Sequence, residues 1–110
     1  MKSDGYGLFL ATLEAQGIPA PGREFQFHPV RRWRIDFYWP YVYSMGGPLA
    51  LEVEGGGWIS GRHNHPSGFA KDMEKYREMT KARIWLLRYA PKELLSVAIP
   101  ELCEIFGVGI

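Results

Sequence analysis

Cysteine is nearly absent from this sequence, which contains Cys103 and no other thiol among its 110 residues. A single cysteine excludes an internal disulfide framework and a zinc site built from several cysteines. It also agrees with a reducing compartment. The residues around Cys103 indicate a small apolar side chain on a terminal helix rather than a reactive nucleophile.

Long hydrophobic runs and an excess of one charge are missing as well. No run of about 18 apolar residues exists, so we expect no membrane-spanning helix. Residues 1–20 contain Asp4 and Glu14 and no clean apolar block, which argues against a signal peptide. The 13 basic and 12 acidic side chains give a formal net charge of +1, so the overall charge does not point to nucleic acid.

The 110 residues correspond to one domain, because a second hydrophobic core does not fit in this length. An apolar fraction of 46% and a charged fraction of 23% are typical of a globular protein and exclude the disordered and collagen-like classes. No internal repeat or low-complexity stretch is present. Aromatic residues make up 15% of the sequence, and in a domain of this size we expect them to build the core.

Hydrophobic periodicity divides the chain into a helix, three strands, a helix, a strand and a last helical segment. The expected helices and strands cover residues 6–16, 24–28, 33–39, 49–54, 67–81 and 83–89. The last segment starts at Pro91 and restarts at Pro100. This order predicts an α/β or α+β domain, in which helices pack on a sheet.

The same periodicity, together with the positions of proline and serine, predicts a turn, a helix cap and core-facing residues. We expect Pro40 to end its strand and residues 41–48 to form the turn of a hairpin. Ser67 is a candidate helix cap, and Phe69, Met73 and Tyr76 are expected to face the core.

Residues 55–68 form a long predicted loop that contains a glycine triplet, Trp58, Arg62, His63 and His65. A loop this long in a small domain is more often functional than not.

Three acidic residues, Asp36, Glu52 and Glu54, alternate with apolar residues on two of the predicted strands. If these strands pair, they lie about 4.8 Å apart, and Glu52 and Glu54 lie about 6.7 Å apart along one strand. Like charges this close repel one another unless something neutralises them, and Mg²⁺ with its preference for oxygen ligands is a natural candidate. The alternative is a polar strand face with solvated carboxylates.

Four segments together resemble a known family. They are FHPVRRWRIDFYWP at 27–40, LALEVEGG at 49–56, GRH at 61–63 and GFAKDMEKY at 68–76. The sequence resembles the small phage and prophage endonucleases of the PD-(D/E)XK nuclease superfamily, near the very-short-patch-repair and VRR-nuclease branches. The resemblance covers about residues 8–90. It implies an α-β-β-β-α-β core with a central mixed sheet flanked by helices, followed here by a C-terminal helix.

The resemblance also implies roles for individual residues. Asp36 matches the first metal-binding aspartate, Glu52 matches the acidic residue of the second half of the motif, and the backbone carbonyl of Val53 is a further metal ligand. Glu54 stands where the motif usually has a lysine. Glu54 itself then acts as a general base or second-metal ligand, or Lys75 on the following helix supplies the positive charge; the alternative for Lys75 is a solvated helix face.

Other polar side chains have weaker assignments. Arg31, Arg32, Arg34, Arg62 and Lys71 are candidate contacts to the nucleic-acid backbone, because planar guanidinium groups bind phosphate bidentately and lysine adds positive charge.

The histidines and Trp58 have open alternatives. His63 is a candidate catalytic residue near the scissile phosphate, and a zinc pair of His63 with His65 is the less favoured alternative. We expect His28 to be structural. Trp58 stacks on a base or packs in the core.

The sequence therefore predicts a Mg²⁺-dependent endodeoxyribonuclease in which Mn²⁺ substitutes for Mg²⁺, with structure-dependent or weakly sequence-specific cleavage. The alternatives are a non-catalytic nucleic-acid-binding module and a phage interaction protein on the same fold. DNA is the expected substrate, with RNA as the open alternative. A homodimer that cuts two strands symmetrically, phage replication, recombination or packaging partners, and the bacterial cytoplasm are further expectations.

Overall fold

The computed structural model describes residues 5–54 and 66–109, the first six of the second range by their backbone alone. Within them the chain forms a four-stranded sheet and three α-helices. The strands are β1 (Gly22–Phe25), β2 (Ile35–Val42), β3 (Gly47–Val53) and β4 (Trp85–Tyr89). The helices are α1 (Gly7–Ala15), α2 (Pro66–Lys81) and α3 (Ile99–Phe106). The predicted order of helices and strands is confirmed.

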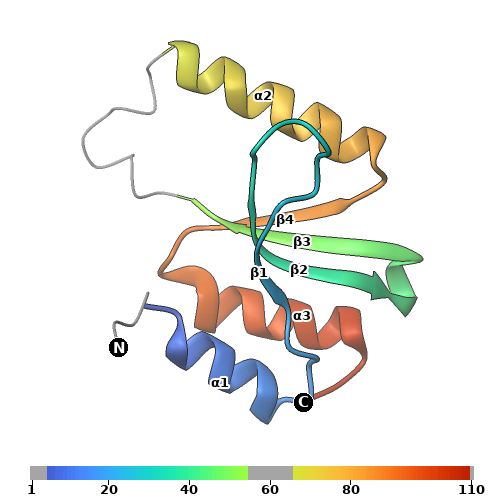
Figure 1. The fold of residues 1–110 in the computed structure, drawn as a ribbon. Helices are drawn as coiled ribbons and strands as arrows, with labels where there is room; N and C mark the ends of the chain where they lie inside the picture. The colour runs from blue at the N-terminus through green and yellow to red at the C-terminus, as the bar shows by residue number, and fades with distance from the viewer. Residues whose placement is uncertain (1–4, 55–65, 110) are drawn as a thin grey trace.

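The sheet is mixed and has the strand order β1-β2-β3-β4. The first three strands are antiparallel, whereas β4 runs parallel to β3. A parallel neighbour needs a crossover connection, and α2 lies within that connection. Figure 1 shows α2 on one side of the sheet and α1 with α3 on the other. The domain is therefore a three-layer α+β structure.

Each face of the sheet carries a hydrophobic cluster. On the side of α1 and α3, Phe37 pairs with Leu51 and Trp39 pairs with Leu49, and all four side chains are buried. On the side of α2, a smaller cluster contains four buried residues, Ile35, Ala50, Met79 and Ile84. Because helices cover both faces, the alternation of β3 does not separate a core face from a solvent face.

This double coverage corrects one sequence-based expectation. Alternation along β3 predicts that Glu52, with Ala50 two residues before it, lies on a polar face that points to solvent. Instead Ala50 is fully buried and Glu52 is only 7% exposed, because α2 packs over them. Met73 was expected to face the core but is 45% exposed, and Met79 further along α2 fills that place.

Several expected boundaries are also wrong. β2 begins at Ile35 and runs through Pro40 to Val42. The register shifts between Trp39 and Val42, and such an irregularity tolerates the missing N–H of a proline. The short helix Tyr43–Met45 then leads directly into β3.

The other strands and helices differ by a few residues from the prediction. β1 is displaced toward the N-terminus and contains Glu24, whose φ of 52° lies in the left-handed region. Ser67 lies inside α2, which begins at Pro66, so it is not the cap. A π-helical turn, Leu94–Ala98, precedes α3, where Cys103 is buried as expected. None of the described helices has both the length and the apolar composition that crossing a bilayer requires.

Candidate functional site

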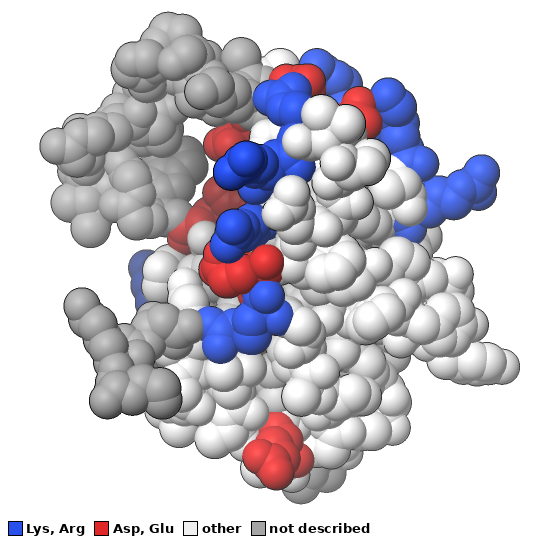
Figure 2. Space-filling model, viewed as in Figure 1, with Lys and Arg blue, Asp and Glu red and all other residues white. Residues whose placement is uncertain are grey.

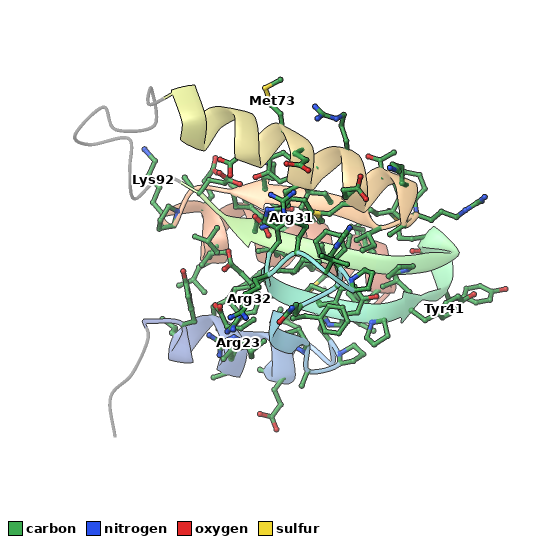
Figure 3. The ribbon with its side chains drawn as sticks, turned by 45° about the horizontal axis from the view of Figure 1, so that its top comes forward. Arg23, Arg31, Arg32, Tyr41, Met73 and Lys92 are labelled. Carbon is green, nitrogen blue, oxygen red and sulfur yellow. The ribbon has the colours of Figure 1, made fainter. Side chains whose placement is uncertain are left out.

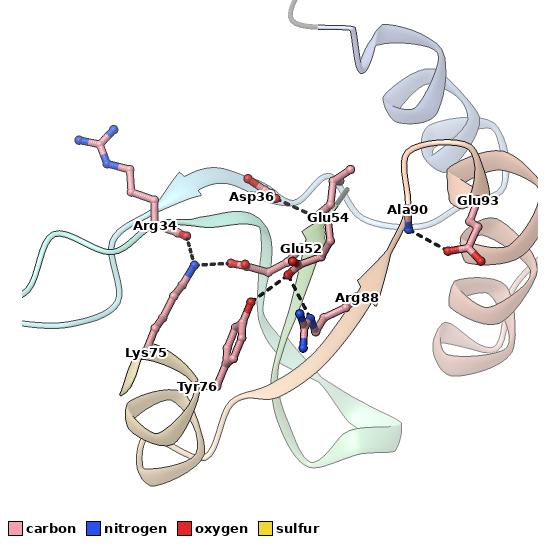
Figure 4. A network of polar contacts seen from close by, with 10 residues as sticks. Arg34, Asp36, Glu52, Glu54, Lys75, Tyr76, Arg88, Ala90 and Glu93 are labelled. Atoms are coloured by element: carbon pink, nitrogen blue, oxygen red, sulfur yellow. Dashed lines mark hydrogen bonds and ion pairs between the residues drawn. The ribbon is translucent and has the colours of Figure 1, made fainter. Parts of the chain in front are cut away.

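The polar residues of β2, β3, β4 and α2 meet at the end of the sheet where β3 finishes (Figure 4). At this end of the sheet, the last paired residues of β2 and β3 are Phe37 and Leu51. Asp36 and Glu52 each lie one residue beyond this pair, on neighbouring strands. The Val53 N–H donates to Asp36 Oδ2 at 2.8 Å. The Asp36 side chain therefore extends the connection between β2 and β3 beyond their backbone pairing.

Glu52 forms a nearly buried ion pair with Lys75 of α2. Lys75 Nζ lies 2.7 Å from Glu52 Oε2, and the two side chains are 12% and 9% exposed. The same Nζ donates to the backbone carbonyl of Arg34 at 2.8 Å. Lys75 thus joins α2 to β3 and to the segment that leads into β2.

The surroundings of Glu52 act on its pKa in opposite directions. Burial raises the pKa of Glu52, and the hydrogen bond and positive charge of Lys75 lower it. The negative charges of Asp36 and Glu54 raise it further, and the net pKa lies above the ordinary value. Asp36 and Glu54 therefore lie close enough for their charges to act on Glu52.

Glu54 is held by two donors on one oxygen. Tyr76 Oη donates to Glu54 Oε2 at 2.8 Å, and Arg88 Nε donates to the same atom at 3.0 Å. The Arg88 guanidinium also lies over the Tyr76 ring, 4.7 Å from its centroid. Burial raises the pKa of Glu54, but the hydrogen bonds from Arg88 and Tyr76 outweigh it, so the net pKa lies below the ordinary value.

Tyr76 and Arg88 are site residues that the sequence analysis did not identify. Tyr76 was assigned to the core, but its hydroxyl reaches Glu54 while its ring packs on the smaller cluster. Arg88 lies opposite Glu52 in the β3–β4 register. The strand–helix–strand order predicts the parallel pairing but not the register that sets Arg88 opposite Glu52, so only the charge of Arg88 within an apolar strand marked it.

Asp36 and Glu52 carry oxygen atoms of the type that a hard divalent cation prefers. Asp36 and Glu52 use Oδ2 and Oε2 in the contacts above, and their second oxygens have no hydrogen-bond partner among the described residues. Two carboxylates with a backbone carbonyl such as that of Val53 are within the usual ligand set of Mg²⁺, which keeps several waters. In the described part of the chain, no group of three acidic, histidine or cysteine side chains is arranged to hold a metal ion.

The arginines before β2 are not equivalent. Arg31 Nη1 lies 2.6 Å from Glu74 Oε2 of α2, and its guanidinium stacks 4.3 Å from the Trp33 ring centroid. Arg32 and Arg34 are exposed. Figure 2 shows basic side chains running down this face of the molecule, with acidic ones between them, and Figure 3 locates Arg31 and Arg32.

His28 organises the loop that carries these arginines. Its Nδ1 accepts the backbone N–H of Val30 at 3.2 Å and of Arg31 at 2.9 Å. Its Nε2 lies 3.3 Å from Glu78 of α2. His28 therefore has the structural position expected from the sequence.

The remaining predicted site residues lie where no contact is described. Trp58, Arg62, His63 and His65 fall outside the described residues, and Lys71 is described only by its backbone in α2.

Comparison with protein-family models, curated proteins and solved structures finds no match to this chain. The resemblance to the nuclease superfamily therefore depends on the sequence segments that carry it.

Proposed function

We propose that this chain is a Mg²⁺-dependent endonuclease that hydrolyses phosphodiester bonds in DNA. The observation that carries the proposal is the nearly buried Glu52–Lys75 pair, 2.7 Å long, beside Asp36 at the end of the sheet. A buried ion pair adds little stability compared with apolar packing, so a chemical role explains its presence better than a structural one. The helix and strand order agrees with the core that the resemblance implies.

Each residue of the site then has a role. Asp36, Glu52 and the Val53 carbonyl hold the cation. Bound Mg²⁺ would lower the pKa of a water molecule and stabilise charge on the phosphate. Lys75 has three donors, of which two are directed to Glu52 and the Arg34 carbonyl. The third has no partner among the described residues, and we propose that it orients the attacking water in the role of the motif lysine.

Glu54 is better suited to a fixed anion than to a general base. Its pKa lies below the ordinary value because Arg88 and Tyr76 outweigh the effect of burial, and a weakly basic carboxylate takes up protons poorly near neutral pH. Arg88 and Tyr76 thus fix the position of Glu54, and we assign the orientation of the attacking water to Lys75. For His63 we keep the proposal that it is a catalytic residue near the scissile phosphate.

Backbone phosphates of the substrate would contact Arg32 and Arg34, which are exposed, whereas Arg31 already pairs with Glu74. Such contacts position the nucleic acid without reading its sequence, so we propose structure-dependent or weakly sequence-specific cleavage. A homodimer would allow both strands to be cut. Phage replication, recombination or packaging proteins in the bacterial cytoplasm are the proposed setting.

One observation favours a second candidate, a nucleic-acid-binding module without catalysis. Lys75 and Arg88 already pair with Glu52 and Glu54, and the Val53 N–H already donates to Asp36. A site satisfied in this way folds without a cation. This candidate predicts binding of DNA but no affinity for Mn²⁺.

The test uses supercoiled plasmid, single-stranded DNA, branched duplex and single-stranded RNA with Mg²⁺, Mn²⁺ or EDTA. Asp36→Asn and Glu52→Gln remove charge from the site, and Glu14→Gln removes an exposed carboxylate of α1 as the matched control. We expect metal-dependent cutting of DNA by the wild type and Glu14→Gln and none by the two site variants. Absence of both cutting and Mn²⁺ binding, the latter by calorimetry, rejects the endonuclease.

A further inference from the structure

We propose that Arg88 is a preoriented phosphate-binding residue of this site, and that its ligand is a nonbridging phosphate oxygen of the nucleic-acid backbone. The inference rests on the proposed function, since it assigns a substrate contact within the same site. It adds a residue that lies far along the chain from the arginines before β2.

The orientation of Arg88 is fixed by contacts with two other side chains. Its Nε donates to Glu54 Oε2 at 3.0 Å, and its guanidinium lies 4.7 Å from the centroid of the Tyr76 ring. Tyr76 donates to the same Glu54 oxygen. Ordering a long arginine side chain costs conformational entropy, and here the fold has already ordered it before a ligand arrives.

Within the described part of the chain, the outer edge of the Arg88 guanidinium makes no hydrogen bond. Its side chain is 49% exposed, and its contact with Glu54 uses Nε. The two Nη groups have no hydrogen-bond partner among the described residues, and together they present the fork that binds two phosphate oxygens. Arg31 differs, because its Nη1 is bound to Glu74.

The position of Arg88 places such a ligand beside the proposed chemistry. Arg88 lies opposite Glu52 in the β3–β4 register. Arg88 and Tyr76 of α2 both donate a hydrogen bond to Glu54 (Figure 4). An anion on the outer edge of Arg88 therefore lies next to the acidic residues.

The local charge determines when this contact forms. Lys75 pairs with Glu52 and Arg88 pairs with Glu54, and Asp36 adds a third carboxylate beside them. Without a cation these groups carry one more negative than positive charge, which disfavours phosphate. A divalent cation on the carboxylates removes this repulsion. We therefore expect the Arg88 contact to be strongest when a cation is present.

The experiment measures fluorescence anisotropy of labelled single-stranded and duplex oligonucleotides over a series of KCl concentrations. Separate titrations contain Ca²⁺, as an oxygen-seeking cation, or EDTA. Arg88→Gln removes the charge, Arg88→Lys keeps the charge without the planar fork, and Tyr76→Phe keeps Arg88 but removes the hydroxyl. Arg83→Gln is the matched control, because Arg83 is exposed and lies before the opposite end of β4.

For duplex in Ca²⁺, we expect Arg88→Gln to weaken binding about tenfold and to reduce the slope of log K against log salt by about 1. Arg88→Lys should keep the slope and weaken binding less, while Arg83→Gln should match the wild type. A merely structural role for Arg88 would lower the unfolding midpoint without changing the salt slope. Circular dichroism melting of every variant separates these effects.

The results distinguish this inference from the proposed function. A wild-type salt slope for Arg88→Gln, or no oligonucleotide binding by the wild type in either buffer, overturns the phosphate contact. Cleavage is measured separately with Mg²⁺. A protein with an Arg88-dependent salt slope but neither cleavage nor Mn²⁺ binding keeps the contact and loses the endonuclease. Cleavage by the wild type together with a wild-type salt slope for Arg88→Gln keeps the endonuclease alone.

Discussion

Lys75 of α2 reaches across to Glu52 of β3 and donates to its Oε2 at 2.7 Å, so that a helix and a strand far apart in the sequence share one nearly buried ion pair. The same Nζ also donates to the Arg34 carbonyl. The pair connects three segments of the chain at the edge of the smaller hydrophobic cluster. Its loss would therefore affect both the packing of α2 and the electrostatics of the site.

Replacing Lys75 with methionine should destabilise the fold by about 3 kcal/mol, because it leaves the Glu52 charge without its partner in a nearly buried position. Adding Glu52→Gln should recover a large part of that loss, since the double variant contains no unpaired charge. Urea unfolding of the two single variants and the double variant measures the coupling. Lys81→Met is the control, because Lys81 is 72% exposed in its pair with Glu78 and should cost little. Additive losses would contradict the coupling.

Glu52 and Glu54 should contribute to stability with opposite pH dependence. The pKa of Glu52 is raised, chiefly by burial, so the folded state binds more protons than the unfolded state and the contribution of Glu52 becomes less favourable as pH rises through this window. The net pKa of Glu54 is lowered because hydrogen bonds from Arg88 and Tyr76 outweigh burial. Its contribution is present above the ordinary carboxyl pKa and is lost as pH falls through the folded value.

Urea unfolding of Glu52→Gln and Glu54→Gln between about pH 3 and pH 7 checks this pair of signs. The stability difference between the wild type and Glu54→Gln should grow with pH, and the corresponding difference for Glu52→Gln should move in the opposite direction. The same sign for both variants would show that the two carboxylates have similar surroundings.

Tyr76→Phe should cost about 1 kcal/mol, because it removes one of the two donors to Glu54 Oε2 but keeps the ring that stacks on Arg88. The pKa of Glu54 should rise toward the ordinary value. Chemical-shift titration of the Glu54 carboxyl measures that change, and urea unfolding measures the cost. An unchanged Glu54 titration would mean that Arg88 alone fixes its charge. Tyr38→Phe serves as the control, because it removes the hydroxyl of another tyrosine of the same cluster.

The order of helices and strands was predictable because the segments have clear periods and most of them end near a glycine or proline, although α2 ends at Lys81 without one. The alternation of β2 and β3 also placed Asp36, Glu52 and Glu54 together once these strands were assumed to pair. The burial of Glu52, however, could not be predicted from the alternation of apolar and polar residues. Helices cover both faces of β3, and a strand covered on both sides gives no pattern that distinguishes them.

Two other differences between the predicted and the observed structure also have physical causes. Pro40 predicts the end of its strand, but the register shift after Trp39 lets β2 continue to Val42. Arg88 lies opposite Glu52 because of the register between β3 and β4, and the order of strands and helices along the chain does not determine that register. Long-range pairing of this kind is fixed by tertiary packing and leaves little trace in either strand alone.

Replacing His28 with alanine should loosen the loop that precedes β2, because the backbone N–H groups of Val30 and Arg31 lose their shared acceptor. We expect a loss of about 1–2 kcal/mol and faster amide exchange at both residues. His28→Asn keeps a short acceptor and should recover part of the protection. Native-state hydrogen exchange of the wild type and both variants is the measurement, and unchanged protection in His28→Ala would show that Arg31 and Glu74 hold the loop without it.

Asp36 has two separable roles, and two substitutions distinguish them. Its Oδ2 accepts the Val53 N–H at 2.8 Å, which holds β2 against β3 beyond their last backbone pair, and its charge belongs to the proposed cation site. Asp36→Asn keeps an acceptor for that N–H, whereas Asp36→Ala leaves it without one. Asp36→Ala should therefore be about 1–2 kcal/mol less stable than Asp36→Asn in urea unfolding.

Both Asp36 variants should lose Mn²⁺ binding and metal-dependent cleavage to the same extent, because both lack the carboxylate charge. Calorimetric titration with Mn²⁺ and plasmid cleavage measure this second role. If Asp36→Asn kept the affinity of the wild type for Mn²⁺, the carboxylate would be a strand connection alone, and the cation site would have to be built without it. If the two variants were equally stable but both lost Mn²⁺, the charge and not the hydrogen bond would explain why an aspartate stands at this position.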